Sequence, residues 1–362
     1  MIFQASPYSQ YKIYKKEIDS AIQKVLSSGR YILGREVEKF ELEFANYIGV
    51  KKAISCASGT DALFIALKQL GIGLGDEVLV PSHTALATVA AVKMTGAKPV
   101  YVDIKKNCYT IDPEKVLNSC SKKTKALIAV HIYGQACDMK KLIQIGKLKK
   151  IKIIEDCAQA VGSAYEKKKL GSIGDVGCFS FFPTKNLSAI GDGGCVVTNN
   201  AVLANKMKRF RQYGWDKKRN TLQSGINSRL DELQAAILRK KLKKLDRDNM
   251  ERNMQAKFYK KKLQSSGIVM PRVCKNTFHS FHLFVIQCEK RDKLMKHLHS
   301  KNILTALHYK TPIHLMPGYS SKAQLPETTK LSKRILSLPL YPGLKRSEQL
   351  KVVNEIKNFY KK

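Results

Sequence analysis

The chain has 362 residues, of which 44% are hydrophobic and 26% charged, with a formal net charge of +36. These values are typical of a folded globular protein with a sizeable core, and they exclude an intrinsically disordered chain. No apolar run approaches membrane-spanning length, and Met1 to Tyr8 lacks the basic and apolar regions of a signal peptide. We therefore expect a cytoplasmic protein without a membrane segment.

The charge of +36 would suit a nucleic-acid-binding protein. However, the lysines are spread along the whole chain in short clusters such as Lys240 to Lys244, and no helix-turn-helix, zinc-finger or RNA-binding signature accompanies them. We therefore expect no nucleic-acid partner, and we expect the positive charge to help attract an anionic substrate. The nine cysteines contain no C-x-x-C pair, so we predict reduced thiols and no metal site.

The first thirty residues are predicted to form an arm and a helix, with Ile18, Ile22, Val25 and Leu26 on one face. From residue 53 the pattern alternates between strands and helices. This alternation predicts an α/β domain with a mostly parallel sheet, whose ligand lies at the carboxyl ends of the strands. The predicted strands are 53–56, 77–80, 98–103, 126–131 and 151–155, and helices are predicted from about residues 58, 84, 113 and 138.

Two β-prone runs, 176–182 and 195–198, flank a loop that Pro183 and several glycines impose. A long helix is predicted from about Leu230 to Leu263, as a connector to a smaller α+β unit. In that unit we expect strands at 281–288 and 303–308, a helix at 292–300 and two further helices around Ser337 to Pro342. The predicted domains are residues 1–245 and 246–362.

Lys185 lies in the loop between the two β-prone runs, with Phe181, Phe182, Leu187 and Ile190 nearby in sequence. A lysine beside apolar side chains loses hydration, which favours its neutral, nucleophilic amine. The alternative is an ordinary surface lysine, so this interpretation depends on the rest of the chain.

Two other segments carry suitable chemistry. Ser58 to Asp61 forms a strand-to-helix turn whose free N–H groups, hydroxyls and glycine could bind phosphate, although a simple helix cap would look the same. Asp156 ends a predicted buried strand, at the edge where a ligand would bind, or else it caps a following helix. A phosphate turn, a strand-end carboxylate and a loop lysine together match what pyridoxal phosphate (PLP) requires.

Several motifs over nearly the whole chain resemble the DegT/DnrJ/EryC1/StrS sugar aminotransferases. The resemblance implies the PLP-dependent transferase fold type I (aspartate aminotransferase-like), with a large domain containing a mostly parallel sheet and a smaller C-terminal α+β domain. The motifs that carry it are Ser58 to Leu63, Gly75 to Thr84, Val130 to Gln135, Glu155 to Ala160, Ser180 to Leu187, Gly225 to Ala236 and Ser337 to Pro342.

By this resemblance, Lys185 would form a Schiff base with PLP and act as the acid and base of catalysis. Asp156 would pair with the pyridine nitrogen, and Gln159 would contact the ring hydroxyl. The family commonly has an aromatic residue where this chain has Ala85, so either His83, the nearest ring, or another group covers the cofactor ring, or that face is looser than usual. The phosphate would be held by Gly59, Thr60 and Ser180, and by Asn227 of a neighbouring subunit, which implies a homodimer with shared active sites.

The motifs look most like the branch that aminates C3 of a dTDP-3-keto-6-deoxyhexose with L-glutamate, for surface polysaccharide or related glycan synthesis. The C4 branch more often has an aromatic residue where Ser228 stands. Residues matching His308 and Tyr309 contact the sugar in the C3 branch, and a lysine matching Lys218 reaches it from the other subunit. Phe182 stands where close relatives often have a tyrosine, which removes one possible contact with the sugar.

Three alternatives remain open. A C4-specific aminotransferase shares most of the motifs, and family members that act on cyclitols or an aromatic precursor also remain possible. A PLP-dependent sugar dehydratase is a third, but its relatives replace the Schiff-base lysine with histidine, and Lys185 is present.

Overall fold

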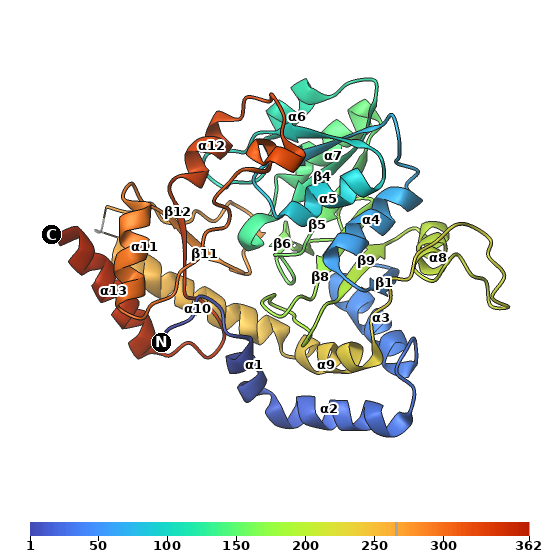
Figure 1. The fold of residues 1–362 in the computed structure, drawn as a ribbon, viewed down its shortest axis with the longest axis horizontal. Helices are drawn as coiled ribbons and strands as arrows, with labels where there is room; N and C mark the ends of the chain where they lie inside the picture. Colours follow the sequence, from blue (N-terminus) through green and yellow to red (C-terminus); the bar gives the residue numbers. More distant parts are fainter. Residues whose placement is uncertain (265–266, 362) are drawn as a thin grey trace.

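The computed structural model describes residues 1–264 and 267–361, and a seven-stranded sheet forms its centre (Figure 1). The strand order is β1-β9-β8-β5-β4-β2-β3, and β9 alone runs opposite to the other six strands of this sheet. The predicted mostly parallel sheet is therefore confirmed. The strands are β1 (Lys52–Cys56), β2 (Glu77–Pro81), β3 (Lys98–Val102), β4 (Thr124–Val130), β5 (Lys152–Asp156), β8 (Val176–Ser180) and β9 (Gly194–Thr198).

Helices cover both faces of this sheet because alternate residues of each strand point to opposite sides. In β5, Ile154 packs in the core beneath α4 (Gly59–Gln69), α5 (Leu86–Met94) and α8 (Ala201–Phe210). Its neighbour Ile153 packs in the opposite core, with α6 (Pro113–Ser119) and α7 (Met139–Lys149). Both faces of the sheet are thus buried, as the apolar strand sequences require.

The C-terminal unit has a core of its own (Figure 1). It is built on α10 (Leu245–Leu263), α11 (Arg291–Ser300), α12 (Pro326–Ser332), α13 (Arg346–Lys361) and the antiparallel pair β11 (Phe284–Gln287) and β12 (Ile335–Leu338). A small sheet of β6 (Ala164–Tyr165), β7 (Lys168–Lys169) and β10 (Thr277–Phe278) joins the two parts of the chain. We retain the division at residue 245 as a proposal.

Three sequence predictions are wrong in detail. The connector is two helices, α9 (Glu232–Leu242) and α10, because the α-helical pattern is interrupted at Lys243 and Lys244, where the N–H of Lys244 donates to the carbonyl of Lys241 three residues back. No strand spans 303–308 among the described elements: Ile303 bridges to Ile2, whereas Ala306 bridges to Ser337, so the segment changes partner too soon.

The third difference is at the N-terminus, where the single predicted helix is two, α1 (Pro7–Ile13) and α2 (Lys15–Ser28). Ile18 and Val25 are buried as expected, but Leu26 is 45% exposed. Among the described helices, none combines the length and the apolar composition needed to cross a membrane.

Helix α3 (Arg35–Ile48) is capped by a side chain from another helix. The buried carboxylate of Glu232 accepts hydrogen bonds from the backbone N–H groups of Gly34, Glu36 and Val37, at 2.8, 2.9 and 2.8 Å. These are N–H groups that the start of a helix leaves without internal partners, and a negative charge there is favourable.

We predict that Glu232→Ala lowers the free energy of unfolding by about 2–3 kcal/mol, because it leaves three donors without their acceptor. Urea denaturation at one fixed protein concentration measures this change. The control is Glu38→Ala, which removes an exposed carboxylate from the same helix and should change stability by less than about 0.5 kcal/mol. Equal effects of the two substitutions would contradict the capping role.

Candidate functional site

Three strand ends bring the predicted site residues to one edge of the sheet. β1, β8 and β5 run in the same direction, so Ser58, Ser180 and Asp156 all lie at their carboxyl ends. Ser58 is the N-cap of α4 and accepts a hydrogen bond from the N–H of Asp61 at 3.1 Å. A β-carbon on Gly59 would lie only 2.6 Å from that of Ser180, so only glycine lets this turn rest against Ser180.

Asp156 is a buried carboxylate with two hydrogen bonds. It accepts from the Thr88 hydroxyl at 2.8 Å and from the N–H of Ala158 at 3.1 Å. Burial raises its pKa, although these hydrogen bonds and the charge of Lys185 oppose the rise. The alternative reading as a helix cap is wrong, because the next regular element is strand β6. The protonated nitrogen of a PLP ring is a cation that fits this carboxylate.

The amine of Lys185 lies near Asp156. Burial lowers the pKa of Lys185 to about 8, and the negative charge of Asp156 only partly opposes that effect. Within the described part of the chain, no hydrogen-bond partner holds this amine. Burial, and then the charge of Lys185, also lower the pKa of His308 to about 4. Both groups therefore lose their protons at a lower pH than usual, which makes a larger fraction of neutral, nucleophilic lysine available near neutral pH.

The apolar side chains around Lys185 divide into two groups. Phe181 and Leu187 are fully buried, whereas Phe182 and Ile190 are 48% and 53% exposed. Only half of the apolar wall expected from the sequence is therefore enclosed within a single chain.

A hydrogen-bonded group lies beside the lysine. The amide of Gln159 accepts from the N–H of Tyr133 at 2.8 Å and donates to the Tyr309 hydroxyl at 2.8 Å. The ring of His83 is buried, 2.6 Å from the Tyr133 hydroxyl and edge-to-face with Tyr309. The imidazole of His308 is 2.9 Å from the Ser337 hydroxyl. The structure thus brings His83, Gln159, His308 and Tyr309 together.

Two predicted residues lie apart from this group. Asn227 and Lys218 are exposed, in the segment between α8 and α9. Part of that segment projects from the body of the molecule (Figure 1), and the N–H of Lys218 donates to Asp216 at 2.8 Å. A single chain therefore does not place either side chain against Lys185. Thr60 is less exposed than these two residues. It is partly buried at the start of α4, next to Gly59, which rests against Ser180.

The loop after Lys185 is fastened by side chains that the sequence analysis did not identify. The buried amine of Lys241 donates to the carbonyl and hydroxyl of Ser188, each at 2.6 Å, and burial lowers the pKa of Lys241 to about 7. The Ser188 hydroxyl donates to Gln10 at 2.8 Å. Asn186 donates to Asn249 at 2.7 Å. These contacts join α1, α9 and α10 to the loop that carries the lysine.

Thr88 and Tyr133 were also missed. Thr88 is in the first turn of α5, and its hydroxyl lies 2.8 Å from that of Thr84, which precedes the helix, so two threonines four residues apart at a helix start were the available signal. Tyr133 adopts a left-handed backbone conformation, with φ of 60°, which nothing in its sequence context indicates.

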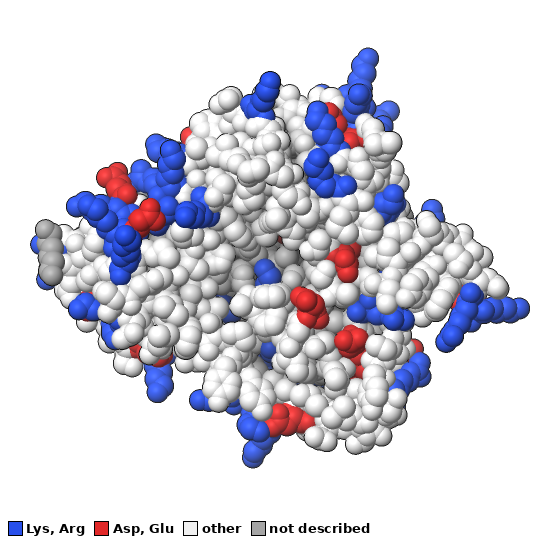
Figure 2. Space-filling model, in the orientation of Figure 1, with Lys and Arg blue, Asp and Glu red and all other residues white. Residues whose placement is uncertain are grey.

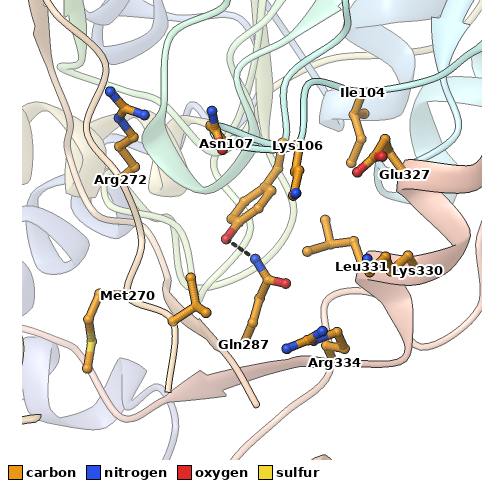
Figure 3. A pocket seen from close by; sticks show the side chains of 12 residues that line it. Ile104, Lys106, Asn107, Met270, Arg272, Gln287, Glu327, Lys330, Leu331 and Arg334 are labelled. Carbon is orange, nitrogen blue, oxygen red and sulfur yellow. Dashed lines mark hydrogen bonds between the residues drawn. The ribbon is translucent and has the colours of Figure 1, made fainter. Parts of the chain in front are cut away.

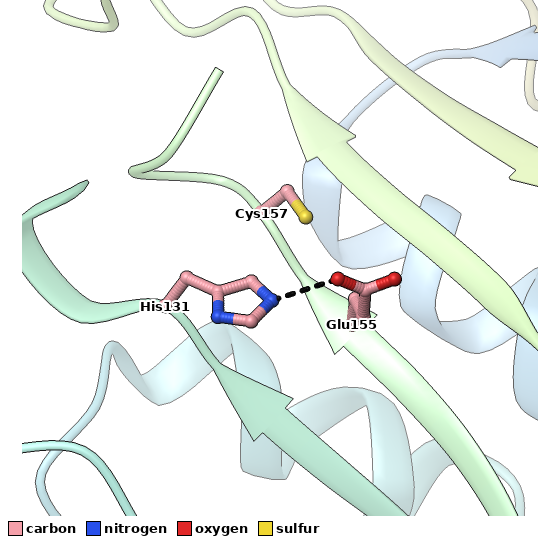
Figure 4. A group of neighbouring side chains, drawn as sticks. All are labelled: His131, Glu155 and Cys157. Atoms are coloured by element: carbon pink, nitrogen blue, oxygen red, sulfur yellow. Dashed lines mark hydrogen bonds and ion pairs between the residues drawn. The ribbon is translucent and has the colours of Figure 1, made fainter. Parts of the chain in front are cut away.

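His131, Glu155 and Cys157 form a buried group whose side-chain ligand atoms are close enough to hold a metal (Figure 4). However, Nδ1 of His131 accepts from the N–H of Cys137, so Nε2 carries the proton and donates to Glu155 at 3.0 Å. Glu155 also accepts from the N–H groups of Gly171, Ile173 and Gly174. These hydrogen bonds engage the imidazole and the carboxylate, and they tie the loop after β7 to β5.

Comparison with known proteins gives consistent matches over almost the full length. The family described as DegT/DnrJ/EryC1/StrS aminotransferase matches residues 12–357. A dTDP-3-amino-3,6-dideoxy-alpha-D-galactopyranose transaminase from Aneurinibacillus thermoaerophilus is 44% identical over 96% of both chains. A dTDP-3-amino-3,4,6-trideoxy-alpha-D-glucose transaminase from Streptomyces venezuelae is 42% identical over 96% of this chain and 93% of its own length.

A solved structure of NtdA from Bacillus subtilis, with the cofactor pyridoxamine phosphate bound, has a TM-score of 0.90 to this chain. It is 33% identical in sequence, and the match covers 96% of this chain and 82% of that one. These similarities confirm the predicted fold class and the PLP cofactor.

Acylation of the protein without bound PLP can test the state of the Lys185 amine. We predict that labelling of Lys185 by acetic anhydride, followed by mass spectrometry of peptides, rises with pH with a midpoint near pH 8 and levels off about 1–2 pH units higher, because only the neutral amine reacts. In Asp156→Asn the midpoint should move to lower pH, since the charge that raises this pKa is lost. Asp175→Asn, at a partly exposed carboxylate bonded to Lys152, is the control.

Labelling of Lys185 that keeps rising toward pH 10.5, the usual pKa of lysine, would contradict the desolvated amine. Exposed lysines of the same protein correct for hydrolysis of the reagent.

Proposed function

The chain belongs to the DegT/DnrJ/EryC1/StrS aminotransferase family and is a PLP-dependent sugar aminotransferase, and from this premise we propose that it aminates C3 of a dTDP-linked 3-keto-6-deoxyhexose with L-glutamate as the donor. The observation that carries the proposal is the amine of Lys185, with its pKa lowered to about 8, beside the buried carboxylate of Asp156. The two relatives named above are both transaminases of dTDP-3-amino sugars, which carry the amino group at C3.

Each residue has a proposed task. Asp156 holds a positive charge at the ring nitrogen, and the N–H groups of Gly59 and Thr60, with the Ser180 hydroxyl, hold the phosphate. Gln159 contacts the ring hydroxyl, and His83 covers the ring face in place of the aromatic residue missing at Ala85. Bound PLP supplies an electron-withdrawing ring that stabilises negative charge on the reacting carbon.

Lys185 holds the cofactor covalently and, once displaced, moves a proton at the reacting carbon of the donor and then of the sugar. A pKa of about 8 suits both tasks, because an amine that titrates close to neutral pH gives up a proton nearly as readily as it takes one. In this proposal, His308, Tyr309 and Phe182 lie on the side of the sugar. The pKa of His308 is lowered to about 4, so its neutral imidazole is too weak a base to compete with Lys185 for the proton.

Ser228 supports C3 rather than C4 specificity. Its hydroxyl donates to Asp61 at 2.7 Å and accepts from the N–H of Ala57 at 3.0 Å, so it fastens the proposed phosphate turn. Ser228 is buried, and an aromatic side chain there would break both bonds and displace the turn. We infer that a C4 enzyme with an aromatic residue at this position must hold the turn differently.

We propose a homodimer in which Lys218 and Asn227 of the partner complete each site, because both are exposed on a projecting segment and Phe182 and Ile190 are left uncovered. Basic side chains do not gather in one area of the face in Figure 2, which favours attraction of small anions over a nucleic-acid footprint. The amino sugar would serve surface polysaccharide or a related glycan.

Absorption spectra of the PLP-loaded protein test the reaction. We predict that L-glutamate removes the yellow colour and that a dTDP-3-keto-6-deoxyhexose restores it, while the 4-keto isomer does not. Lys185→Ala should lower the rate by about 10²–10⁴-fold or more, because proton transfer by a positioned group is lost. Unchanged circular dichroism would verify folding. A protein indifferent to every amino donor would contradict the aminotransferase proposal, and restoration by the 4-keto isomer would contradict C3 specificity.

Mixed dimers test the shared site. Lys185→Ala and the double variant Lys218→Ala/Asn227→Ala should each be impaired alone. Random mixing should restore about a quarter of wild-type activity, because each mixed dimer keeps one intact site if the two mutated sets act across the interface. If Lys218 and Asn227 act within their own chain, mixing restores nothing.

A further inference from the structure

A cavity apart from the amination site lies at the edge of the central sheet (Figure 3). Its volume is about 340 Å³, which is within the range of small-molecule sites. It is bordered by the 104–109 loop after β3, by residues 269–272 and Gln287, and by α12 with Arg334. No sequence motif pointed to it.

The cavity is separate from the amination site. Its inner wall is Tyr109, whose ring packs edge-to-face against Tyr133 with centroids 6.3 Å apart. Tyr133 in turn contacts His83, on the side of Lys185. Two tyrosine rings thus stand between the cavity and the residues proposed to bind PLP, and none of those proposed residues lines the cavity.

Four cations, Lys106, Arg272, Lys330 and Arg334, surround the cavity with a single carboxylate, Glu327. Within the described chain, no ion pair neutralises the first three. Arg334 reaches only Glu289, at 3.5 Å, and the side chain of Glu289 is 82% exposed. In Figure 3, Lys106 enters from above and Arg334 from below. This concentration of charge around a hollow favours an anion with more than one negative charge.

A second observation also points to a ligand. The Nε atom of Arg334 is buried and has no hydrogen-bond partner. A buried donor left without an acceptor costs roughly 1–3 kcal/mol. Among the described residues, the Nε atoms of Arg211, Arg252 and Arg291 also have no hydrogen-bond partner, but Arg334 is the one of these four that lines the cavity. An anionic oxygen at this end of the cavity would supply that acceptor.

The rest of the lining suits an organic body rather than a bare ion. Ile104, Met270 and Leu331 give apolar surface, and the Tyr109 ring gives an aromatic wall. The amide of Gln287 donates to the Tyr109 hydroxyl at 2.7 Å, which leaves its carbonyl oxygen available to a ligand. The cavity therefore offers cations for phosphate groups and an apolar, amide-edged surface for a ring.

We propose that this cavity is a second ligand site, which takes a nucleoside diphosphate group as free nucleotide or as part of a nucleotide sugar. The phosphates would lie among Lys106, Lys330 and Arg334, and the base or sugar against Tyr109, Met270 and Gln287. The proposal concerns binding alone, so it stands or fails independently of the amination reaction.

Calorimetric titration of the PLP-loaded protein with dTDP, with UDP and with inorganic pyrophosphate tests it. We expect a nucleotide-binding event that Lys106→Gln/Lys330→Gln weakens at least tenfold and that Arg334→Met also weakens. Both lysines are exposed at the rim, so the double variant should fold and keep its KM for the sugar and the amino donor. The control, Lys322→Gln/Lys333→Gln, removes the same charge from exposed lysines outside the cavity and should leave binding unchanged.

Titration with a dTDP-sugar distinguishes free nucleotide from nucleotide sugar as the ligand. If the cavity accommodates the sugar, the dTDP-sugar binds like dTDP, and the same variants weaken its binding. Because dTDP also fits the amination site, the test concerns the binding event that the double variant weakens. A double variant whose nucleotide-binding events all keep wild-type affinity, or a control that weakens them equally, would overturn the site. Pyrophosphate that binds as tightly as dTDP would overturn its assignment to nucleosides.

Discussion

The buried carboxylate at the end of β5 is the constraint on which the site depends. Asp156 is out of water, and burial disfavours its charge, so it needs donors and a cation nearby. Thr88 and Ala158 supply the donors, and Lys185 supplies part of the charge. Yet Lys185 is itself desolvated and loses its proton near pH 8. Neither partner fully stabilises the other, and in our proposal the protonated ring of bound PLP supplies the missing positive charge.

The environment of Lys185 also explains why so many side-chain contacts hold the loop around it. An amine without a hydrogen-bond partner is positioned only by its backbone, so the loop must be held by other means. Lys241, Gln10 and Asn249 do this through Ser188 and Asn186, and they come from three different helices. The amine of Lys185, which we propose to be catalytic, is thus left free to react, while neighbouring residues make the hydrogen bonds that fix its position.

Much of the large domain was predictable because its signals are local. A serine before a helix, a proline after Asp112 and a carboxylate at the end of an apolar run each report the structure of a few adjacent residues. The missing parts depend on distant contacts. Thr88 meets Asp156 across 68 residues, and Lys241 meets Ser188 across 53. The 303–308 segment has strand-like residues, but its two bridging partners come from opposite ends of the chain.

The lysines of this protein fall into two groups with opposite properties, and the net charge does not distinguish one group from the other. Lys241 is buried and Lys185 is partly buried, and their pKa values are lowered to about 7 and about 8, so each loses its proton more readily than an exposed lysine does. Lys106 and Lys330 stay exposed at a cavity rim, where they can meet a phosphate at little desolvation cost. The formal count of +36 includes both kinds alike. Burial, which the count does not contain, lowers the pKa of Lys185 and Lys241, and only the amine without a hydrogen-bond partner is left able to react.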